Sequence, residues 1–483
     1  MPPVDDRPLA GPRARARAVA PVAVALLLAG IVAVAPSARA DDRGLVPPAD
    51  PTLAALIDEA LAARPELKVA RATVDAERAR VPQAGALPDP MLQVGWQNDG
   101  FTSIELGSME GSYVSIMASQ TFPWLGKRAL RREVAALDVS RASQAVARWR
   151  LSTEAEVRRS YLALVLVRDR LALLGELEQV WQRSLGAARA RLEAGTGAQS
   201  DLLRAQLELG RIKQRRIALA LEDVVGVQAL NRLRGHPLDE PIATATAVHE
   251  LPALAGFADA FAVDDALARS PELAAARLGV RSATSSVALA KKGFYPDLEI
   301  GAGIMIRGSM PPMWLVTVGG AVPLFAGRKQ RRAVDESRAL DRAAEEQVRA
   351  IEQVLRLRTA ERRASFLALV ETIALYDQGL LTQSAATAES TLTQYAVGRV
   401  TFAAVLDANA GFIADREGYL QAVVAAHRLL IAEAEVSLEP TPGLGGGVGG
   451  AGMPGVGATS MGATPGAPAT TAAPASAGAS SGM

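Results

Sequence analysis

The amino-acid sequence predicts a mixed α/β membrane fold in which a helix, a pair of strands and a long helical hairpin occur twice. Four sequence landmarks recur in the same order at a spacing of roughly 200 residues. In each copy, short segments alternate apolar and polar residues with a period of two, which indicates strands. Each strand pair is followed by a long proline-free run rich in helix formers.

The N-terminus has the pattern of an export signal. Three arginines precede an uncharged run over 18–35, and 37–40 supplies the small-x-small ending that signal peptidase accepts. We therefore expect a cleaved signal peptide over 1–40. The alternative is a membrane anchor, because the run approaches the ~18 apolar residues that spanning requires. Pro21 and Gly30 weaken that alternative, and no helical membrane span is expected in the mature chain.

Composition excludes several classes of function. Lys and Arg number 52 against 51 Asp and Glu, so a broad nucleic-acid-binding surface is not expected. Cysteine is absent, which excludes disulfides, thiolate metal sites and a thiol nucleophile. Hydrophobic residues make up 49% of the chain but aromatic residues only 4%, a balance that favours long, closely packed helices.

The landmarks divide the chain into two repeats. Their pairs are 63–67 with 268–273, 85–89 with 293–297, 122–128 with 322–329, and 194–203 with 397–406. We predict a first repeat over 41–245 and a second over 246–439. Residues 440–483 contain no charge and are rich in Gly, Ala, Pro and Ser, so they are predicted to be a disordered tail.

Each repeat opens with a helix that proline ends. Helices are expected over 66–81 and 272–292, followed by breaks at prolines. Four strands follow, and each has one apolar face and one mostly small or polar face. Their apolar residues are Leu92, Val94 and Trp96; Val114, Ile116 and Ala118; Leu298, Ile300, Ala302, Ile304 and Ile306; and Trp314, Val316 and Val318. Segments of this size approach the ~10 residues of a tilted membrane strand.

A helical hairpin follows each strand pair. The first arm, 127–193, would be about 100 Å long at 1.5 Å per residue. Glycines mark the turns, at Gly195-Thr196-Gly197 and at Gly398.

Four strands are too few to close a membrane barrel, since known barrels start at about eight. Open strand edges in hydrocarbon would leave backbone N–H and C=O groups unpaired, at several kcal/mol each. The chain must therefore associate with itself if these are membrane strands. Two copies would give eight strands and three would give twelve, and sequence physics does not choose between them.

The order of elements over 50–439 resembles the outer-membrane efflux protein family represented by TolC. The matching residues are Ala62, Pro65 and Leu67 with Ala268, Pro271 and Leu273, the Gly-Ala-Leu-Pro-Asp-Pro segment 85–90, the Pro-x-x-Gly-Lys-Arg segment 123–128, and the glycine turns. The resemblance implies a homotrimer with a shared 12-stranded β-barrel in the outer membrane of a Gram-negative bacterium, continued by a periplasmic α-helical barrel. It also implies a periplasmic adaptor and an inner-membrane pump of the resistance-nodulation-division type as partners, with outer-membrane lipid around the barrel.

The resemblance places a gate and an adaptor contact at the hairpin tips. The residues it assigns there are Gly195, Asp201, Tyr395, Gly398, Arg399 and Asp407. A ring of carboxylates around a narrow bore would favour cations. Ala404 stands where the family's best-known member has a second acidic residue, so a double carboxylate ring is not expected. For Asp201 the alternative is a carboxylate that simply meets the helix macrodipole.

The methionines suggest a substrate. Outside the initiator and the tail, the six methionines are Met91, Met109, Met117, Met305, Met310 and Met313, all in the strand regions. Thioethers are soft ligands that suit Cu(I) and, by the same argument, Ag(I), although methionine also fills gaps. The Phe-Pro-Trp-Leu-Gly-Lys-Arg segment resembles the heavy-metal branch of the family. Heavy-metal cations are thus the expected substrate; drug or organic-solute efflux and type I secretion are alternatives.

No enzyme site or cofactor is expected. The histidines 236, 249 and 427 are scattered and are expected at surfaces or interfaces, and Gly126-Lys127 lacks the upstream glycine of a phosphate loop. The basic clusters 127–132 and 328–332 would form a collar at the membrane face or ordinary solvated helix starts. A periplasmic coiled-coil adaptor is the alternative from another class of protein.

Overall fold

The computed structural model describes residues 50–100 and 103–440. The predicted signal peptide 1–40 and the tail beyond Pro440 lie outside the described residues. The described residues up to Glu439 belong to one compact unit.

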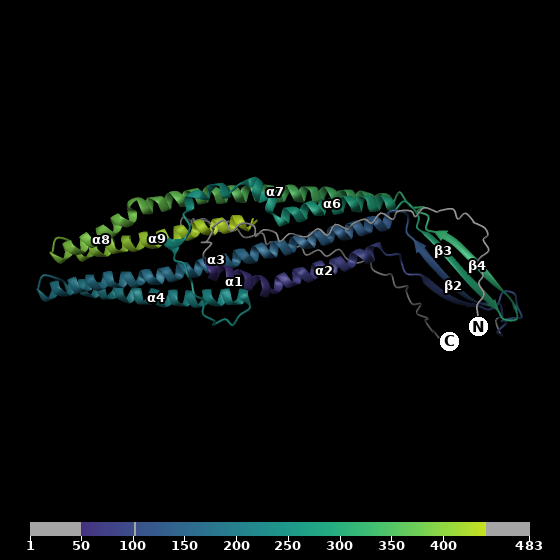
Figure 1. Ribbon diagram of the computed structural model, residues 1–483, viewed down its shortest axis with the longest axis horizontal. Coiled ribbons are helices and arrows are strands. Elements are labelled where there is room, and N and C mark those ends of the chain that lie inside the picture. Colours follow the sequence, from purple (N-terminus) through teal and green to yellow (C-terminus); the bar gives the residue numbers. More distant parts are fainter. Residues whose placement is uncertain (1–49, 101–102, 441–483) are drawn as a thin grey trace, which may run out of the picture. The chain divides into compact units, whose positions relative to one another are not determined.

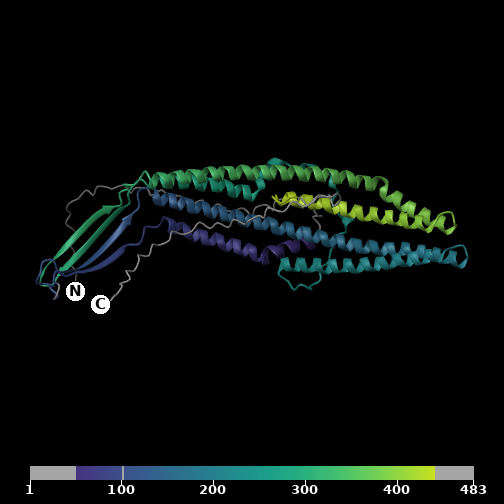
Figure 2. The same cartoon turned by 180° about the vertical axis from the view of Figure 1, so that it is seen from behind.

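The predicted order of elements is confirmed in both repeats. The first repeat contains α1 (Pro51–Ala63), α2 (Pro65–Gly85), β1 (Met91–Gln97), β2 (Tyr113–Phe122), α3 (Lys127–Glu193) and α4 (Gln199–Arg234). The second contains α5 (Val263–Arg269), α6 (Pro271–Lys292), β3 (Leu298–Arg307), β4 (Met310–Gly320), α7 (Gln330–Leu375), α8 (Leu381–Ala396) and α9 (Phe402–Ala434). Three short 3-10 turns lie between α4 and α5, at Val248–Glu250, Leu254–Gly256 and Ala258–Ala260. Within the unit, the strands lie at one end of the helices and the α3–α4 and α8–α9 turns at the other (Figure 1, Figure 2).

Proline and capping residues explain where the helices begin. Asp50 caps α1 by accepting hydrogen bonds from the amides of Thr52 and Leu53 at 3.0 and 3.3 Å. Pro51 occupies the first turn, where the missing N–H has no helical partner. Helix α2 continues past the predicted end at residue 81 and includes Pro82 in its last turn. Pro82 cannot donate to the preceding turn and its ring crowds the carbonyl four residues earlier, and the helix ends three residues later at Gly85.

The four strands form one antiparallel sheet in the order β1-β2-β3-β4. Its register brings the predicted apolar residues into rows across the sheet. One row consists of Val94, Ile116, Ile304 and Trp314. This face is open to the outside of the single chain: Trp314 is 80% exposed and Val318 70% exposed. A continuous exposed apolar face on a sheet indicates contact with lipid or another apolar partner.

The helices bury most of the apolar core. In the middle of the unit, Tyr161, Leu164 and Leu230 pack in one cluster, and nearer the hairpin turns Leu174 and Trp181 belong to a second. Helix α7 also buries an ion pair with α9: Arg362 Nη1 lies 3.1 Å from Glu433 Oε2, and both side chains are 2% exposed.

Among the described residues, one window within Gln330–Ala396 is long and apolar enough to cross a membrane by length and composition alone, with a mean hydropathy of 1.2 and 11% of it buried.

Two further features differ from the sequence expectations. A π-helical turn at Tyr376–Leu380 joins α7 to α8, with Gly379 inside it. His427, expected at a surface or interface, is instead fully buried in α9, because it lies on the side of that helix that faces the core.

Candidate functional site

Both hairpin turns are built on a glycine in the left-handed region. Gly195 has φ +72° and Gly398 has φ +79°, values that strain other L-residues. The amides of Thr196 and Gly197 donate to the Arg191 carbonyl at 2.9 and 2.8 Å, and the Arg399 amide donates to the Gln394 carbonyl at 2.9 Å. These bonds satisfy carbonyls that the ends of α3 and α8 leave free.

The structure brings Asp201 and Tyr395 into direct contact between the two tips. The Tyr395 hydroxyl donates to Asp201 Oδ2 at 3.0 Å. The tyrosine ring is 1% exposed and packs edge-on against Phe402, with ring centroids 5.2 Å apart. Asp201 also lies in the first turn of α4, so the macrodipole alternative holds alongside the tyrosine contact.

Arg191 completes this contact and was not predicted from the sequence. Its guanidinium lies 4.6 Å from the centre of the Tyr395 ring. Nη1 donates to the Tyr395 carbonyl at 2.8 Å and Nη2 donates to the Thr196 carbonyl at 3.0 Å. The only sequence signal is a basic residue in the last turn of α3, which is common. We call Arg191, Asp201 and Tyr395 the tip contact.

The environment of Tyr395 favours the neutral phenol. Burial, together with the hydrogen bond to the Asp201 carboxylate and its negative charge, raises the pKa of Tyr395 to about 12, although Arg191 opposes the shift. The hydroxyl therefore stays protonated throughout the neutral range and remains the hydrogen-bond donor to Asp201.

Two other predicted tip residues, Arg399 and Asp407, take no part in this contact. Both side chains are exposed, and neither forms an ion pair with any residue that the structure describes. They are therefore free to face a bore or another protein. Ala404 is partly buried and contributes no charge.

The sheet register sorts the candidate methionines. Met117, Met305 and Met313 lie on the face opposite the apolar rows, where Met305 is directly opposite Met313 and Met117 is opposite Gly303. A Cβ on Gly303 would lie 2.6 Å from Met117 Cγ, so the glycine makes room for that thioether. We call these three residues the methionine row. Met109 lies in a loop, and Met310 follows a register shift after Met305.

No hard-metal site accompanies the methionine row. Among the described residues, no three His, Cys, Asp or Glu side chains are grouped to hold a metal ion.

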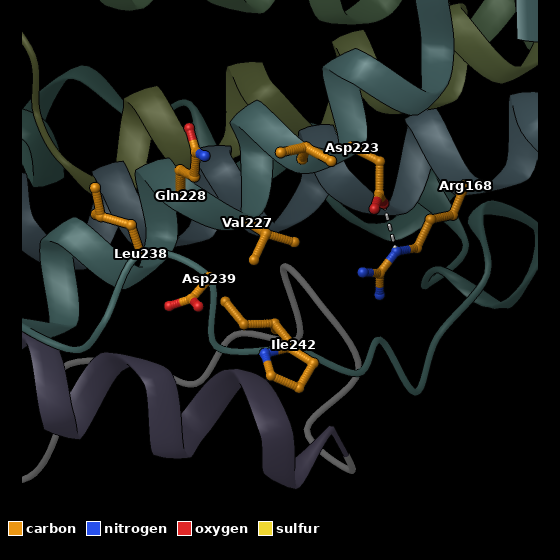
Figure 3. Close-up of a pocket in the computed structure, with 9 residues that line it drawn as sticks. Arg168, Asp223, Val227, Gln228, Leu238, Asp239 and Ile242 are labelled. Carbon is orange, nitrogen blue, oxygen red and sulfur yellow. Dashed lines mark hydrogen bonds and ion pairs between the residues drawn. The ribbon is translucent and has the colours of Figure 1, made fainter. Parts of the chain in front are cut away.

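A cavity of about 350 Å³ lies beside α4 and the segment that follows it (Figure 3). There the Arg168 Nε donates to Asp223 Oδ1 at 2.8 Å and its Nη1 donates to Thr244 Oγ1 at 3.0 Å. Leu238 and Ile242 line the same cavity, and the charges of Arg168 and Asp223 are already paired with each other.

Comparison with known proteins identifies the family. Residues 56–236 and 262–436 match the outer membrane efflux protein family. Both stretches lie inside the predicted repeats, whose boundaries stay predictions. No curated protein is similar enough in sequence to match the chain.

Solved structures of outer-membrane proteins have the same fold. VceC from Vibrio cholerae is 18% identical, with a TM-score of 0.67 over 80% of this chain and 96% of that one. The outer-membrane channel MtrE from Neisseria gonorrhoeae is 18% identical, with a TM-score of 0.64 over 80% and 89%. CusC is also 18% identical, with a TM-score of 0.66 over 81% and 93%. At these identities the likeness concerns the fold.

The family match extends over both repeats and most of the described residues. It rejects the alternative of a periplasmic coiled-coil adaptor, and it explains why the sequence offers no catalytic site. The chain belongs to the outer membrane efflux protein family, whose members are channels of tripartite efflux systems that extend from the outer membrane into the periplasm, and not enzymes.

Proposed function

We propose that three copies of this chain form a passive duct that carries soft heavy-metal cations, such as Cu(I) or Ag(I), out of the cell. A periplasmic adaptor and a pump of the resistance-nodulation-division type would deliver the cation to the hairpin tips. The duct itself supplies a path and no energy, so the driving step belongs to the pump.

The open sheet supports the assembly. Among the described strands, β1 and β4 each pair on one side only, and the apolar face between them is exposed. In a membrane the unpaired backbone groups on these edges would each cost several kcal/mol. Three copies placed edge to edge would close a ring of twelve strands with the apolar face toward lipid.

The observation that carries the metal substrate is the methionine row. If the apolar face meets lipid, the opposite face lines the bore, and Met117, Met305 and Met313 lie on it. Met117 and Met305 are half-buried and Met313 is 46% exposed, so their thioethers are accessible from that side. Several weak, soft ligands in sequence suit a path through which a cation must also leave.

A tolerance panel tests the proposal. Deletion of the gene is expected to sensitise cells to copper and silver, and the wild-type gene should restore tolerance. The variant Met305→Leu/Met313→Leu keeps side-chain volume but removes thioethers, so it should restore metal tolerance only in part. Met109→Leu, in the loop between β1 and β2, is the matched control outside the row and should restore it fully.

Each outcome separates the duct from its substrate. Sensitivity of the deletion strain to lipophilic drugs alone would reject the metal and favour drug or organic-solute efflux. Loss of a secreted protein without either sensitivity would favour type I secretion. Metal sensitivity with full rescue by both methionine variants would keep the metal duct and reject the methionine row as its path.

A further inference from the structure

The first repeat is fastened to the second by a contact at the junction of sheet and helices. The buried Lys127 Nζ, at the start of α3, lies 2.7 Å from Asp297 Oδ1 and donates to the Tyr295 carbonyl at 2.9 Å. The Trp124 amide donates to the same carboxylate oxygen at 2.7 Å. The rings of Trp124 and Tyr295 stack with centroids 5.1 Å apart and 13° between planes. We call this the inner joint.

The charges of Lys127 and Asp297 stabilise each other in the inner joint. Burial alone would raise the pKa of Asp297, but the hydrogen bonds from Lys127 and the Trp124 amide, with the positive charge of Lys127, lower it below its ordinary value. Lys127 is 8% exposed, which is unusual for a lysine and requires a partner.

The corresponding positions of the two repeats supply a second base and a second acid, which have no partner among the described residues. By the repeat landmarks, Arg328 corresponds to Lys127 and Asp89 corresponds to Asp297, since 85–89 repeats as 293–297 and 122–128 repeats as 322–329. Arg328 and Asp89 are both exposed, and neither forms an ion pair with any described residue. The apolar counterparts are open as well: Leu324 is 83% exposed and Phe325 76% exposed.

We infer that this second set forms an outer joint between copies, in which Arg328 of one copy pairs with Asp89 of the next. The inference rests on the proposed duct, because it needs a second copy beside the first. Within one chain, the second repeat supplies the acid and the first supplies the base. In a closed ring, the second repeat of one chain lies beside the first repeat of the next chain, so Asp89 of that next chain supplies the acid that Arg328 lacks.

The strand register provides a separate check. Applying the β2–β3 register to β4 and the next copy's β1 places Val318 opposite Val94 and Val316 opposite Trp96. All of these residues belong to the apolar face, so the derived register keeps that face continuous across the seam. It also places Pro311 and Pro312, which have no N–H to donate, beyond the end of β1.

Helices beside the seam are open in the same way. In one chain, α3 packs along α6, and the corresponding pair across a seam would be α7 with the next copy's α2. Leu340 on α7 and Val69 on α2 are 60% and 66% exposed, which leaves apolar surface for that contact. The outer joint would therefore lie at the membrane end of a longer helical seam.

Cross-linking tests the outer joint directly, because the chain has no cysteine of its own. We would introduce Asp89→Cys with Arg328→Cys in the full-length protein, in cells, and treat membranes with a short bis-maleimide. A bis-maleimide suits an ion-pair distance better than a disulfide, which needs Cα atoms within about 7 Å. The expected result is a ladder of cross-linked dimers and trimers. Asp75→Cys with Arg328→Cys, which moves one thiol to the middle of α2, should remain almost entirely as single copies.

Charge exchange gives a second readout. Asp89→Arg and Arg328→Asp should each lower the temperature at which the detergent-solubilised assembly dissociates, and the double variant should recover most of the loss. A stable trimer without the cross-linked ladder and without recovery would overturn the outer joint while leaving the duct intact. A wild-type protein that is a single copy in detergent would overturn both.

Discussion

Replacing Tyr395 with phenylalanine should loosen the tip contact and leave its packing in place. The change removes the hydroxyl that donates to Asp201 at 3.0 Å, while the ring can still pack against Phe402 and Arg191. A hydrogen bond to a charged acceptor contributes about 1.5–3 kcal/mol. Asp201 is only half-buried, so water can replace part of the loss, and we expect about 1.5 kcal/mol per copy.

That free energy decides the expected size of the effect. About 1.4 kcal/mol corresponds to a tenfold change in an equilibrium, so each tip should open roughly tenfold more often. If three copies open together, the three terms add to about 4.5 kcal/mol, a shift of roughly a thousandfold. We further propose that the hairpin tips form the gate that the family resemblance implies. On that proposal, Tyr395→Phe should convert brief openings into a long-lived conducting state.

Conductance in planar lipid bilayers measures this directly. Purified wild-type protein should show a low, closed level, and Tyr395→Phe and Asp201→Asn should both show a higher mean conductance. Tyr419→Phe is the matched control, because Tyr419 also bonds an aspartate, Asp377, but lies away from the tips. Equal conductance in Tyr395→Phe and wild type would refute the reasoning, as would an equal rise in the control.

Three further predictions concern stability, each measured by denaturant unfolding of the detergent-solubilised protein. Burial alone would raise the pKa of Asp50, but hydrogen bonds from two hydroxyls and two amides lower it. The folded state thus binds this proton more weakly than the unfolded state. The ionised Asp50 therefore stabilises the fold above the unfolded pKa, and this stabilisation is lost as the pH falls through the folded pKa. Asp50→Asn should reduce the loss of stability with acid below about pH 4. Gly195→Ala should cost about 1–2 kcal/mol because of its φ of +72°, whereas Gly210→Ala, inside α4 with open space around it, should stabilise by up to about 1 kcal/mol. Glu433→Gln leaves Arg362 buried without its carboxylate and should cost about 3–5 kcal/mol; a loss under about 1 kcal/mol would mean that water reaches the pair.

The order and bounds of the helices and strands were predictable because residues at their ends and within them mark them locally. Helix α3 spans Lys127–Glu193, the predicted arm, since Gly126 and Gly195 both adopt positive φ at its ends. The strand pattern was predictable because a period of two is visible without knowledge of partners. These signals depend on a residue and its near neighbours alone.

Features that depend on partners were not predictable. The role of Arg191 requires the two hairpin tips to meet, and its sequence position is an ordinary helix end. The methionine row requires the strand register, which places Met305 directly opposite Met313. The burial of His427 depends on which side of α9 faces the core, and apolar residues surround His427 on both sides in the sequence.

The π-helical turn depends on both kinds of information. Gly379 is a local sign that the helix changes there. The facing helix contributes Gly418, where a Cβ would lie 2.4 Å from the Tyr376 hydroxyl oxygen. A glycine on α9 therefore makes room for a tyrosine on the turn, a pairing that no single segment reveals.

The fusion of two repeats into one chain changes how the proposed ring would assemble. The inner joint of Lys127 and Asp297 forms between segments tethered by one chain, at an effective concentration set by the connector and independent of protein concentration. Only the outer joints would wait for encounters between molecules. Half of the seams would thus be complete once each chain has folded, and the concentration dependence of ring closure would be that of three subunits and not of six separate ones. Every second seam of the ring would thus form as one chain folds, and only the remaining seams would form by association of subunits.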